Sequence, residues 1–304
     1  MKQKIIIIAG PTAVGKTAAG VMVARSFGGE VVSADSVQVY RGADIGSAKV
    51  TKIEMQGIPH HLIDICAPVD TFSAGEFAGL AKQKIAEIAA RGKVPIIVGG
   101  TGLYISSLLF PLTSSGAKDD KLRTQLYDYA RTNGAMALFE ELKSIDPETA
   151  QKLHPNQLDR IVRAIEIFKT TGVKKSSLVR TYNSEYDYLL IVLTDEREAL
   201  YSRINARVDK MINAGLIDEV RGLVEKYNLT KNNQIMQGIG YKEVYDYLTG
   251  KTDQKTCIDL IKQRSRNYAK RQLTWFKKMP NAVFVNVSNR DEIIPLCEKF
   301  LKDK

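Results

Sequence analysis

Short apolar runs alternate with amphipathic stretches over the first 110 residues. The runs are rich in β-branched residues, and each ends in glycine or a small polar residue: "KIIIIAG", "EVVSADS" and "VPIIVGG". Such runs are typical of buried parallel strands. Between the last two, Ser73 and Glu76 have the spacing of a capping box, which predicts a helix that stops at Arg91-Gly92. This alternation predicts a parallel sheet covered by helices.

The pattern changes from about residue 113, where "TSSGAKDD" has the composition of a linker. Almost everything that follows reads as helix. One stripe of apolar residues predicts a helix with Asn156 as its N-cap and Gly172 as its stop; its members are Leu158, Ile161, Ile165 and Phe168. The polar segment "KKSSLVRTYNSEYD" then closes the region, and we expect it to be mobile. We therefore predict a helical insertion domain at 113–184 within a core made of 1–112 and 185–304.

The strand pattern resumes after this insertion with "YLLIVLTD", and "NAVFVNV" near the C-terminus predicts a further strand. Asp195 follows the first of these strands, where a metal-binding acid of a nucleotidase could stand. The spacing of Asp195 and Glu198 favours a capping box for the next helix instead. A last helix is expected in "DEIIPLCEKFLK".

Composition narrows the class of protein. The chain has 304 residues, of which 44% are hydrophobic and 26% charged, as in ordinary soluble globular proteins. No apolar run approaches the length of a membrane span, and Ile5–Ala9 is too short for a secretion signal. The three cysteines are widely spaced, which favours buried thiols in a cytoplasmic protein over disulfides or a zinc site. The net charge of +10 indicates a polyanionic partner, either a nucleic acid or an anionic membrane.

The clearest chemical motif is "GPTAVGKT", which fits the phosphate-binding P-loop between a strand and a helix. Its residues are Gly10, Pro11, Thr12, Ala13, Val14, Gly15, Lys16 and Thr17. The loop amides and the helix N-terminus can hold a diphosphate, Lys16 adds a charge, and Thr17 can coordinate Mg²⁺. The motif therefore predicts a P-loop NTPase-like fold that binds a diphosphate, without specifying a nucleotide.

Features that would specify a nucleotide are missing: there is no N-K-x-D motif and no convincing strand-terminal metal acid. Asp35 instead follows the second strand, at the edge where open α/β sheets place ligands. On position alone it could equally be a helix cap or an outer ligand of Mg²⁺. Thr101, in "GGTGLY", offers a hydroxyl at the same edge. The glycines around it would also suit a simple tight turn.

Two further groups of residues invite a binding role. His60 and His61 are adjacent, so in an extended chain they point to opposite sides, and we expect hydrogen bonding and no zinc site. The segment "IKQRSRNYAKRQLTWFKK" is basic and contains no acid, which suits an RNA backbone. A solvated helix face would explain the same charges. We expect Trp275 and Phe276 to face the core.

Eight motifs together resemble the bacterial tRNA dimethylallyltransferases, also called tRNA isopentenyltransferases. In chain order they are "GPTAVGKT", "DSVQVYRGADIGSAK", "GIPHHLIDI", "GGTGLY", "HPNQLDRIVRAIEIF", "INAGLIDEV", "GIGYKE" and "YAKRQLTWF". The first is shared by a large superfamily, whereas the second, third, fifth and last are far more restrictive. The resemblance extends nearly from end to end. It implies transfer of a dimethylallyl group from dimethylallyl diphosphate to N6 of adenosine 37, which lies 3′ of the tRNA anticodon.

The resemblance also implies roles for individual residues. Asp35 would be the general base, Thr101 would contact the leaving oxygen, and Lys16 would neutralise the departing diphosphate. Arg207 would reach the diphosphate, although an isolated arginine more often lies on a solvated face. The helical insertion would clamp the anticodon stem-loop, and Mg²⁺ would be the cofactor. Contacts to the tRNA are expected from Ser36, Gln38, Gln157, Arg160, Arg264, Arg266, Lys270 and Arg271.

Three other functions remain to be weighed. An adenylate isopentenyltransferase would share the P-loop and Asp35 but would need neither the insertion nor the basic helix. A P-loop small-molecule kinase would transfer phosphate, which "GGTGLY" and "DSVQVY" disfavour. A non-catalytic RNA-binding protein would have no use for Lys16, Thr17 and Asp35 together. We expect a cytoplasmic monomer with no membrane partner.

Overall fold

The computed structural model describes residues 2–110, 116, 118–178 and 184–303. Its contacts divide the chain into two compact units, one made of 1–109 with 184–304 and the other of 110–183. The boundaries expected from the sequence, after residues 112 and 184, lie beside these divisions. Both expected linkers fall partly outside the described residues, and their mobility remains a prediction.

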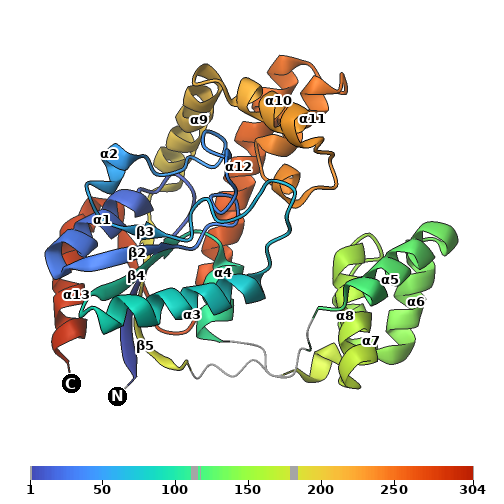
Figure 1. Cartoon of the computed structure of the whole chain (residues 1–304), viewed down its shortest axis with the longest axis horizontal. Coiled ribbons are helices and arrows are strands. Elements are labelled where there is room, and N and C mark those ends of the chain that lie inside the picture. The colour runs from blue at the N-terminus through green and yellow to red at the C-terminus, as the bar shows by residue number, and fades with distance from the viewer. Residues whose placement is uncertain (1, 111–115, 117, 179–183, 304) are drawn as a thin grey trace. The chain divides into compact units, whose positions relative to one another are not determined.

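The larger unit is built on a six-stranded parallel sheet with the order β3-β2-β4-β1-β5-β6 (Figure 1). The strands are β1 Gln3–Ala9, β2 Gly29–Ser33, β3 His60–His61, β4 Val94–Gly99, β5 Tyr186–Thr194 and β6 Ala282–Asn286. Five of them coincide with the apolar runs in the sequence. The two-residue β3 is an edge strand that the sequence pattern does not mark as a strand.

Strand β1 lies in the middle of the sheet because its side chains are apolar on both faces. Ile5, Ile6, Ile7 and Ile8 are all fully buried. Since successive side chains of a strand point to opposite faces, both faces of the sheet must be covered. Ile6 and Ile8 belong to a core cluster that includes residues of α1, α9 and α13.

Helices cover the sheet as the strand–helix alternation predicts. They are α1 Lys16–Phe27, α2 Lys52–Met55, α3 Ala74–Ala90, α4 Gly102–Leu109 and α13 Ile293–Lys302. Helix α1 packs against α13, and α3 packs against α4 (Figure 1). The capping box of Ser73 and Glu76 is present at the start of α3, which ends before Arg91 as expected. The predicted fold class, a P-loop NTPase-like parallel sheet flanked by helices, is confirmed.

Four further helices precede β6 in the larger unit: α9 Arg197–Asn213, α10 Leu216–Tyr227, α11 Tyr241–Leu248 and α12 Gln254–Phe276. Helix α12 contacts α4, α9 and α11. The expected capping box of Asp195 and Glu198 is wrong. The N-cap of α9 is Glu196, because the Asp195 side chain instead accepts a hydrogen bond from the Glu196 amide and pairs with Arg203.

The described part of the smaller unit contains helices and no strand: α5 Asp120–Asn133, α6 Ala135–Ile145, α7 Pro147–Gln151 and α8 Leu158–Thr171. They share their own apolar core, in which Ile161 and Ile165 of the predicted stripe are fully buried. Gly172 ends α8 in the left-handed conformation, as predicted. The predicted cap Asn156 is wrong by one residue, since the chain turns into the helix at Gln157.

The composition predicts buried thiols at the three cysteines and no membrane span. Cys66, Cys257 and Cys297 are buried free thiols, as expected. Within the described ranges, no helix combines the length and the apolar character needed to cross a bilayer.

Candidate active site

The P-loop connects β1 to α1 at the carboxyl edge of the sheet. Its backbone needs conformations that side chains disfavour. Gly10 has φ of 143°, and a Cβ atom there would lie 2.7 Å from the carbonyl oxygen of Leu193. Gly15 caps α1 with φ of 93°. These glycines let the loop pack closely against Leu193 and turn into α1, whose first amides favour an anionic ligand.

Two arginines that the sequence pattern does not identify bind backbone carbonyl groups of this loop. Arg203 Nε donates to the carbonyl oxygen of Ala13 at 3.1 Å, and Arg290 Nη2 donates to that of Val14 at 3.4 Å. These contacts fix the carbonyl groups of Ala13 and Val14. The backbone amides of such a loop are suited to phosphate oxygens.

Lys16 and Arg207 bring positive charge to this site, close enough for each charge to affect the other. Lys16 Nζ donates to the carbonyl oxygen of Pro11 at 2.6 Å, and Arg207 Nη2 donates to that of Ser47 at 3.5 Å. Burial, and next the charge of Arg207, lower the pKa of Lys16 to about 7, although Asp35 opposes the shift. A bound diphosphate would raise the pKa of Lys16 again, because its negative charge stabilises the protonated amine.

Asp35 lies in the loop that follows β2, beside the P-loop lysine. Its Oδ1 atom accepts hydrogen bonds from the amides of Val37 at 2.9 Å and Gln38 at 3.2 Å. These bonds define a turn and fix the direction of the carboxylate. Both are accepted by the same oxygen, so among the described residues the other carboxylate oxygen remains available to a substrate. Asp35 therefore has a structural role and can also act as a base.

Thr101 joins the same site from the end of β4. Its amide donates to the carbonyl oxygen of Ala34 at 3.2 Å, and its hydroxyl accepts a hydrogen bond from the Ser36 amide at 3.1 Å. The sequence-predicted residues Asp35, Ser36 and Thr101 thus come together at one edge of the sheet. Gly99 allows the close approach that this requires, because a Cβ atom there would lie 2.1 Å from the carbonyl oxygen of Ala34.

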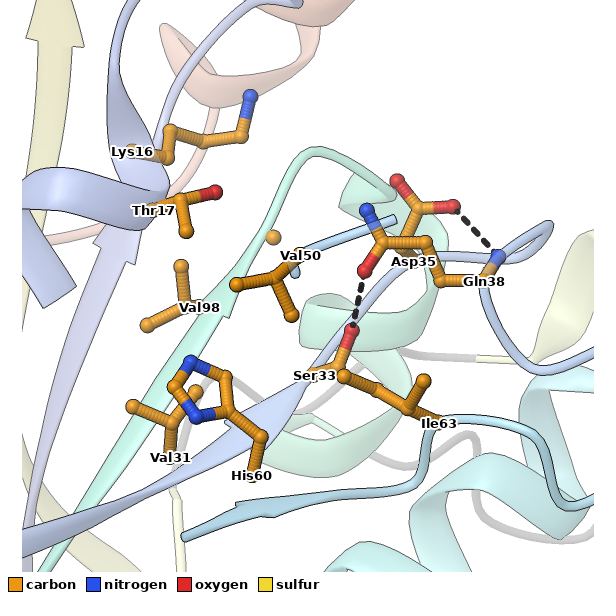
Figure 2. A pocket seen from close by; sticks show the side chains of 11 residues that line it. Lys16, Thr17, Val31, Ser33, Asp35, Gln38, Val50, His60, Ile63 and Val98 are labelled. Carbon is orange, nitrogen blue, oxygen red and sulfur yellow. Dashed lines mark hydrogen bonds between the residues drawn. The ribbon is translucent and has the colours of Figure 1, made fainter. Parts of the chain in front are cut away.

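Gln38 is held by hydrogen bonds at both ends of its amide group. Its Nε2 atom donates to the carbonyl oxygens of Ser47 at 3.4 Å and Ala48 at 3.3 Å, and its Oε1 accepts from Ser33 Oγ at 3.5 Å. Figure 2 shows Gln38 and Asp35 side by side at one side of a pocket whose opposite side carries Lys16 and Thr17. The pocket thus has a carboxylate and an amide facing the phosphate-binding loop.

A magnesium ion at this pocket would need oxygen ligands. No group of three or more His, Cys, Asp or Glu residues within the described ranges could hold a metal. Magnesium on a phosphate substrate, however, takes only one or two protein ligands and keeps several waters. Thr17 lines the pocket near Asp35. Its hydroxyl and the oxygens of a diphosphate form a donor set that fits Mg²⁺.

Two residues of α12 that are not predicted from the sequence, Gln272 and Tyr268, also reach the site. Gln272 is buried, with its Oε1 accepting from the Thr12 amide at 2.9 Å and its Nε2 donating to the Gly100 carbonyl at 2.8 Å. The Tyr268 hydroxyl lies within hydrogen-bonding reach of Thr101 and Gln272, and burial raises its pKa to about 12. The four-residue spacing within "YAKRQLTWF" is the signal that places both side chains on one helix face.

The basic residues of α12 divide into two sets. Lys262 pairs with Asp209 at 2.6 Å, Arg264 pairs with the buried Glu243, and Arg266 donates to Asn205 Oδ1 at 2.6 Å. The predicted tRNA contacts Arg264 and Arg266 are thus engaged within the larger unit itself. Lys270 and Arg271 are exposed.

The expectation that Trp275 and Phe276 both face the core is half right. Phe276 is fully buried, whereas Trp275 is 40% exposed. The indole lies against Gly102, where a Cβ atom would come within 2.4 Å of its ring, and Nε1 donates to Ser106 Oγ at 2.9 Å. Successive helix positions differ by about 100°, so the two neighbours point in different directions and here are buried to different extents.

In the smaller unit, Gln157 and Arg160 lie at the start of α8. Gln157 Oε1 accepts from the His154 amide at 3.1 Å, and Arg160 is exposed. A buried carboxylate lies farther along the helix. Glu166 is 0% exposed and accepts from Arg123 Nε at 2.9 Å and Arg163 Nη1 at 2.6 Å, and these bonds hold its pKa at about 2 against the opposing effect of burial.

The adjacent histidines point to different surroundings, as expected. His60 Nδ1 donates to the carbonyl oxygen of Ile58 at 2.9 Å, and its ring lines the pocket. His61 Nε2 lies 2.7 Å from Glu30 Oε2, which also pairs with Arg91.

Comparisons with known proteins agree with this geometry. A sequence model of the family described as IPP transferase matches residues 38–279. A tRNA dimethylallyltransferase of Geobacillus thermodenitrificans is 49% identical over 305 residues, covering 99% of this chain and 96% of the relative. The crystal structure of a full-length tRNA isopentenylpyrophosphate transferase from Bacillus halodurans is 44% identical, with a TM-score of 0.72 and 99% of each chain covered. A eukaryotic dimethylallyltransferase acting on tRNA has a TM-score of 0.86 at 31% identity, with 98% of this chain and 79% of the other covered. The chain belongs to the IPP transferase family.

Proposed function

We propose that this protein transfers the dimethylallyl group of dimethylallyl diphosphate to N6 of adenosine 37 in tRNA, with diphosphate as the second product. The observation that carries the proposal is that one pocket is lined both by the P-loop residues Lys16 and Thr17 and by the Asp35 carboxylate. A diphosphate donor needs a loop that binds its phosphates, and an acceptor that must lose a proton needs a base. Transfer from one to the other requires both in the same pocket. Relatives named tRNA dimethylallyltransferase support the same reaction.

Cleavage of the donor requires neutralisation of the leaving group. An allylic C–O bond breaks readily because the resulting cation is delocalised, so the barrier depends on the charge that develops on the diphosphate. Lys16, Arg207 and the loop amides are fixed around the position of that charge before the reaction begins. When bound at Thr17, Mg²⁺ would supply further positive charge to the same oxygens.

Attack by adenine requires removal of a proton. The N6 lone pair is conjugated with the ring, and the nitrogen becomes strongly acidic as its new C–N bond forms. An ionised carboxylate can then accept the proton, and Asp35 presents one in a fixed direction because the amides of Val37 and Gln38 hold it. The electron pair of the N–H bond remains on N6, and the diphosphate leaves with the pair of the C–O bond.

The target base must leave its stack to enter the pocket. Gln38 lines the pocket together with Asp35, and Ser36 follows Asp35 in the chain; we assign both to recognition of the adenosine. Outside the pocket, the exposed Lys270 and Arg271 of α12 are suited to the RNA backbone. In the smaller unit, we assign Gln157 and Arg160 to the anticodon stem-loop.

An assay with donor labelled in its five-carbon group tests this function. The protein is incubated with the labelled donor, Mg²⁺ and unmodified tRNA or AMP, and the nucleosides are then separated. We expect label on adenosine 37 of the tRNA and none on AMP. Label on AMP alone would instead indicate an adenylate isopentenyltransferase, and phosphate transfer from ATP without prenyl transfer would indicate a kinase.

A further inference from the structure

We propose that the His60 imidazole limits the donor of this site to a five-carbon chain by closing the apolar end of the pocket. The inference rests on the proposed function, because it concerns the tail of the diphosphate donor. It assigns a specificity role to a residue that takes no part in bond cleavage or proton transfer.

The pocket has a polar side and an apolar floor. Lys16 and Thr17 border it at the P-loop, and Asp35 borders it from the loop after β2. The floor consists of aliphatic side chains from β2, β4 and two loops: Val31, Val50, Ile63 and Val98. A donor whose diphosphate occupies the P-loop therefore has an aliphatic surface available for its hydrocarbon tail.

His60 stands at the end of this floor. In Figure 2 its ring lies beside Val31, on the side of the pocket away from Lys16. The ring is anchored, since Nδ1 donates to the carbonyl oxygen of Ile58 at 2.9 Å. Burial also lowers the pKa of His60, which favours the neutral form of the ring. A neutral, anchored ring can close the apolar end of the pocket without burying a charge that water would have to solvate.

A ring that closes the apolar end of the pocket limits the length of the hydrocarbon tail that fits. The next longer prenyl donor, geranyl diphosphate, carries five more carbons, which would have to occupy the position of the imidazole. His60 is only partly buried, so removal of its ring opens the pocket outward rather than into packed core. A pocket that excludes even one methylene discriminates by about 10- to 200-fold, and exclusion of five carbons is at least as strong.

His61 is the matched control. It is the next residue in β3, and its side chain leaves the pocket to meet Glu30 Oε2 at 2.7 Å. A substitution there disturbs the same edge strand without changing the pocket wall. A change in donor preference that both substitutions cause would therefore come from disturbance of the strand. A change that only the His60 substitution causes would come from the altered pocket wall.

The test compares kcat/KM for geranyl and dimethylallyl diphosphates, with the same tRNA, in the wild type, His60→Ala, His60→Phe and His61→Ala. We expect the geranyl-to-dimethylallyl ratio to rise at least about 10-fold in His60→Ala. It should stay near the wild-type value in His60→Phe, which keeps a ring at this position, and in His61→Ala. If His60→Ala turns over too slowly, affinities of the two non-cleavable thiodiphosphate analogues give the same ratio.

An unchanged ratio in His60→Ala, or an equal rise in His61→Ala, would overturn the assignment of His60. Wild-type protein that transfers neither prenyl group to tRNA would instead contradict the proposed function itself. The two failures are therefore distinguishable in the same set of measurements.

Discussion

Gln272 and Thr12 are 260 positions apart in the chain, yet the Gln272 side chain accepts a hydrogen bond from the Thr12 amide at 2.9 Å. The same side chain donates to the carbonyl oxygen of Gly100 at 2.8 Å. One buried amide group thus joins the P-loop to the glycine-rich loop that carries Thr101. Helix α12 thereby fixes the distance between the P-loop and the loop that carries Thr101.

Replacing Gln272 by Ala should therefore lower kcat/KM by about 10- to 100-fold. Two buried backbone groups would lose their partner, at a cost of about 1–3 kcal/mol. Steady-state kinetics with varied donor would show the loss, and Gln263→Ala, at an exposed position of the same helix, serves as the control. Equal kinetics for the two variants would show that this bridge does not position the loops.

Asp35→Asn should reduce turnover by about 10²-fold or more while leaving tRNA affinity largely intact. Asparagine keeps the shape of the side chain and an acceptor for the amides of Val37 and Gln38, but it cannot take the proton of N6. Single-turnover rates and a filter-binding titration of tRNA separate the two effects. Near-normal rates in this variant would remove Asp35 from the role of base.

Donor binding should weaken as the pH rises. The pKa of Lys16 is lowered to about 7, so the free protein loses this ammonium as the pH passes through that value. Because only the charged form suits the diphosphate, we expect the affinity to fall about 10-fold for each pH unit above 7. Calorimetric titration with a non-cleavable donor analogue between pH 6 and 9 measures this slope. Lys16→Arg provides the comparison, since a guanidinium stays protonated and should flatten the profile; a flat wild-type profile would contradict the role of Lys16.

The loop that follows Gln38 is held by a single carboxylate. Glu219 accepts hydrogen bonds from the successive amides of Asp44, Ile45 and Gly46 at 2.9, 2.6 and 3.0 Å, and from the Tyr241 hydroxyl at 2.7 Å. Hydrogen bonds to a charged group contribute about 1.5–3 kcal/mol each. This clamp sets the position of the Ser47 carbonyl, to which both Gln38 and Arg207 donate.

Glu219→Gln should accordingly raise the KM for donor and for tRNA together and lower kcat/KM about 10-fold. Neutral glutamine offers weaker acceptors to three amides, so the loop would lose its fixed path. Glu225→Gln, at an exposed site of the same helix, is the matched control. Wild-type kinetics in Glu219→Gln would mean that the loop keeps its path without the charge.

We expect the smaller unit to lose stability as the pH falls below 4.5, before the pH reaches the folded-state pKa of Glu166. The folded pKa of about 2 is depressed, so the stabilisation is present above the unfolded value of 4.5 and is lost as the pH falls toward 2. Glu166→Gln should remove this pH dependence and lower the free energy of unfolding by about 3 kcal/mol, because Arg123 and Arg163 lose a buried partner. Thermal unfolding monitored by circular dichroism from pH 7 to 3 would show both effects, and identical curves for the two proteins would refute them.

Much of the fold and part of the candidate site can be predicted from local patterns. The apolar runs before Gly10 and Gly100 mark strands because strands buried on both faces have no room for polar residues. Since parallel strands end at one edge, the residues that follow them must converge. Local patterns are therefore enough to place Asp35 and Thr101 together.

What could not be predicted depends on contacts between distant segments. Nothing local distinguishes Gln272 from the exposed Gln263, and the direction of each is decided by how α12 packs. Arg290 lies against Gly15 only because β6 and the turn after it return to the P-loop. The ion pairs of α12 could not be predicted for the same reason. The acids that pair with Arg264 and Lys262 lie on other helices, so the sequence of α12 does not reveal them.

The most direct test is the identity of the ligand in the P-loop. Crystals of the protein with Mg²⁺ are soaked with equal concentrations of a non-cleavable dimethylallyl thiodiphosphate and a non-hydrolysable ATP analogue. We predict a diphosphate bound by Gly10–Thr17, with its five-carbon tail between Asp35 and Val50. A nucleoside triphosphate in the loop, with no prenyl group in the pocket, would contradict the prenyl-transfer function.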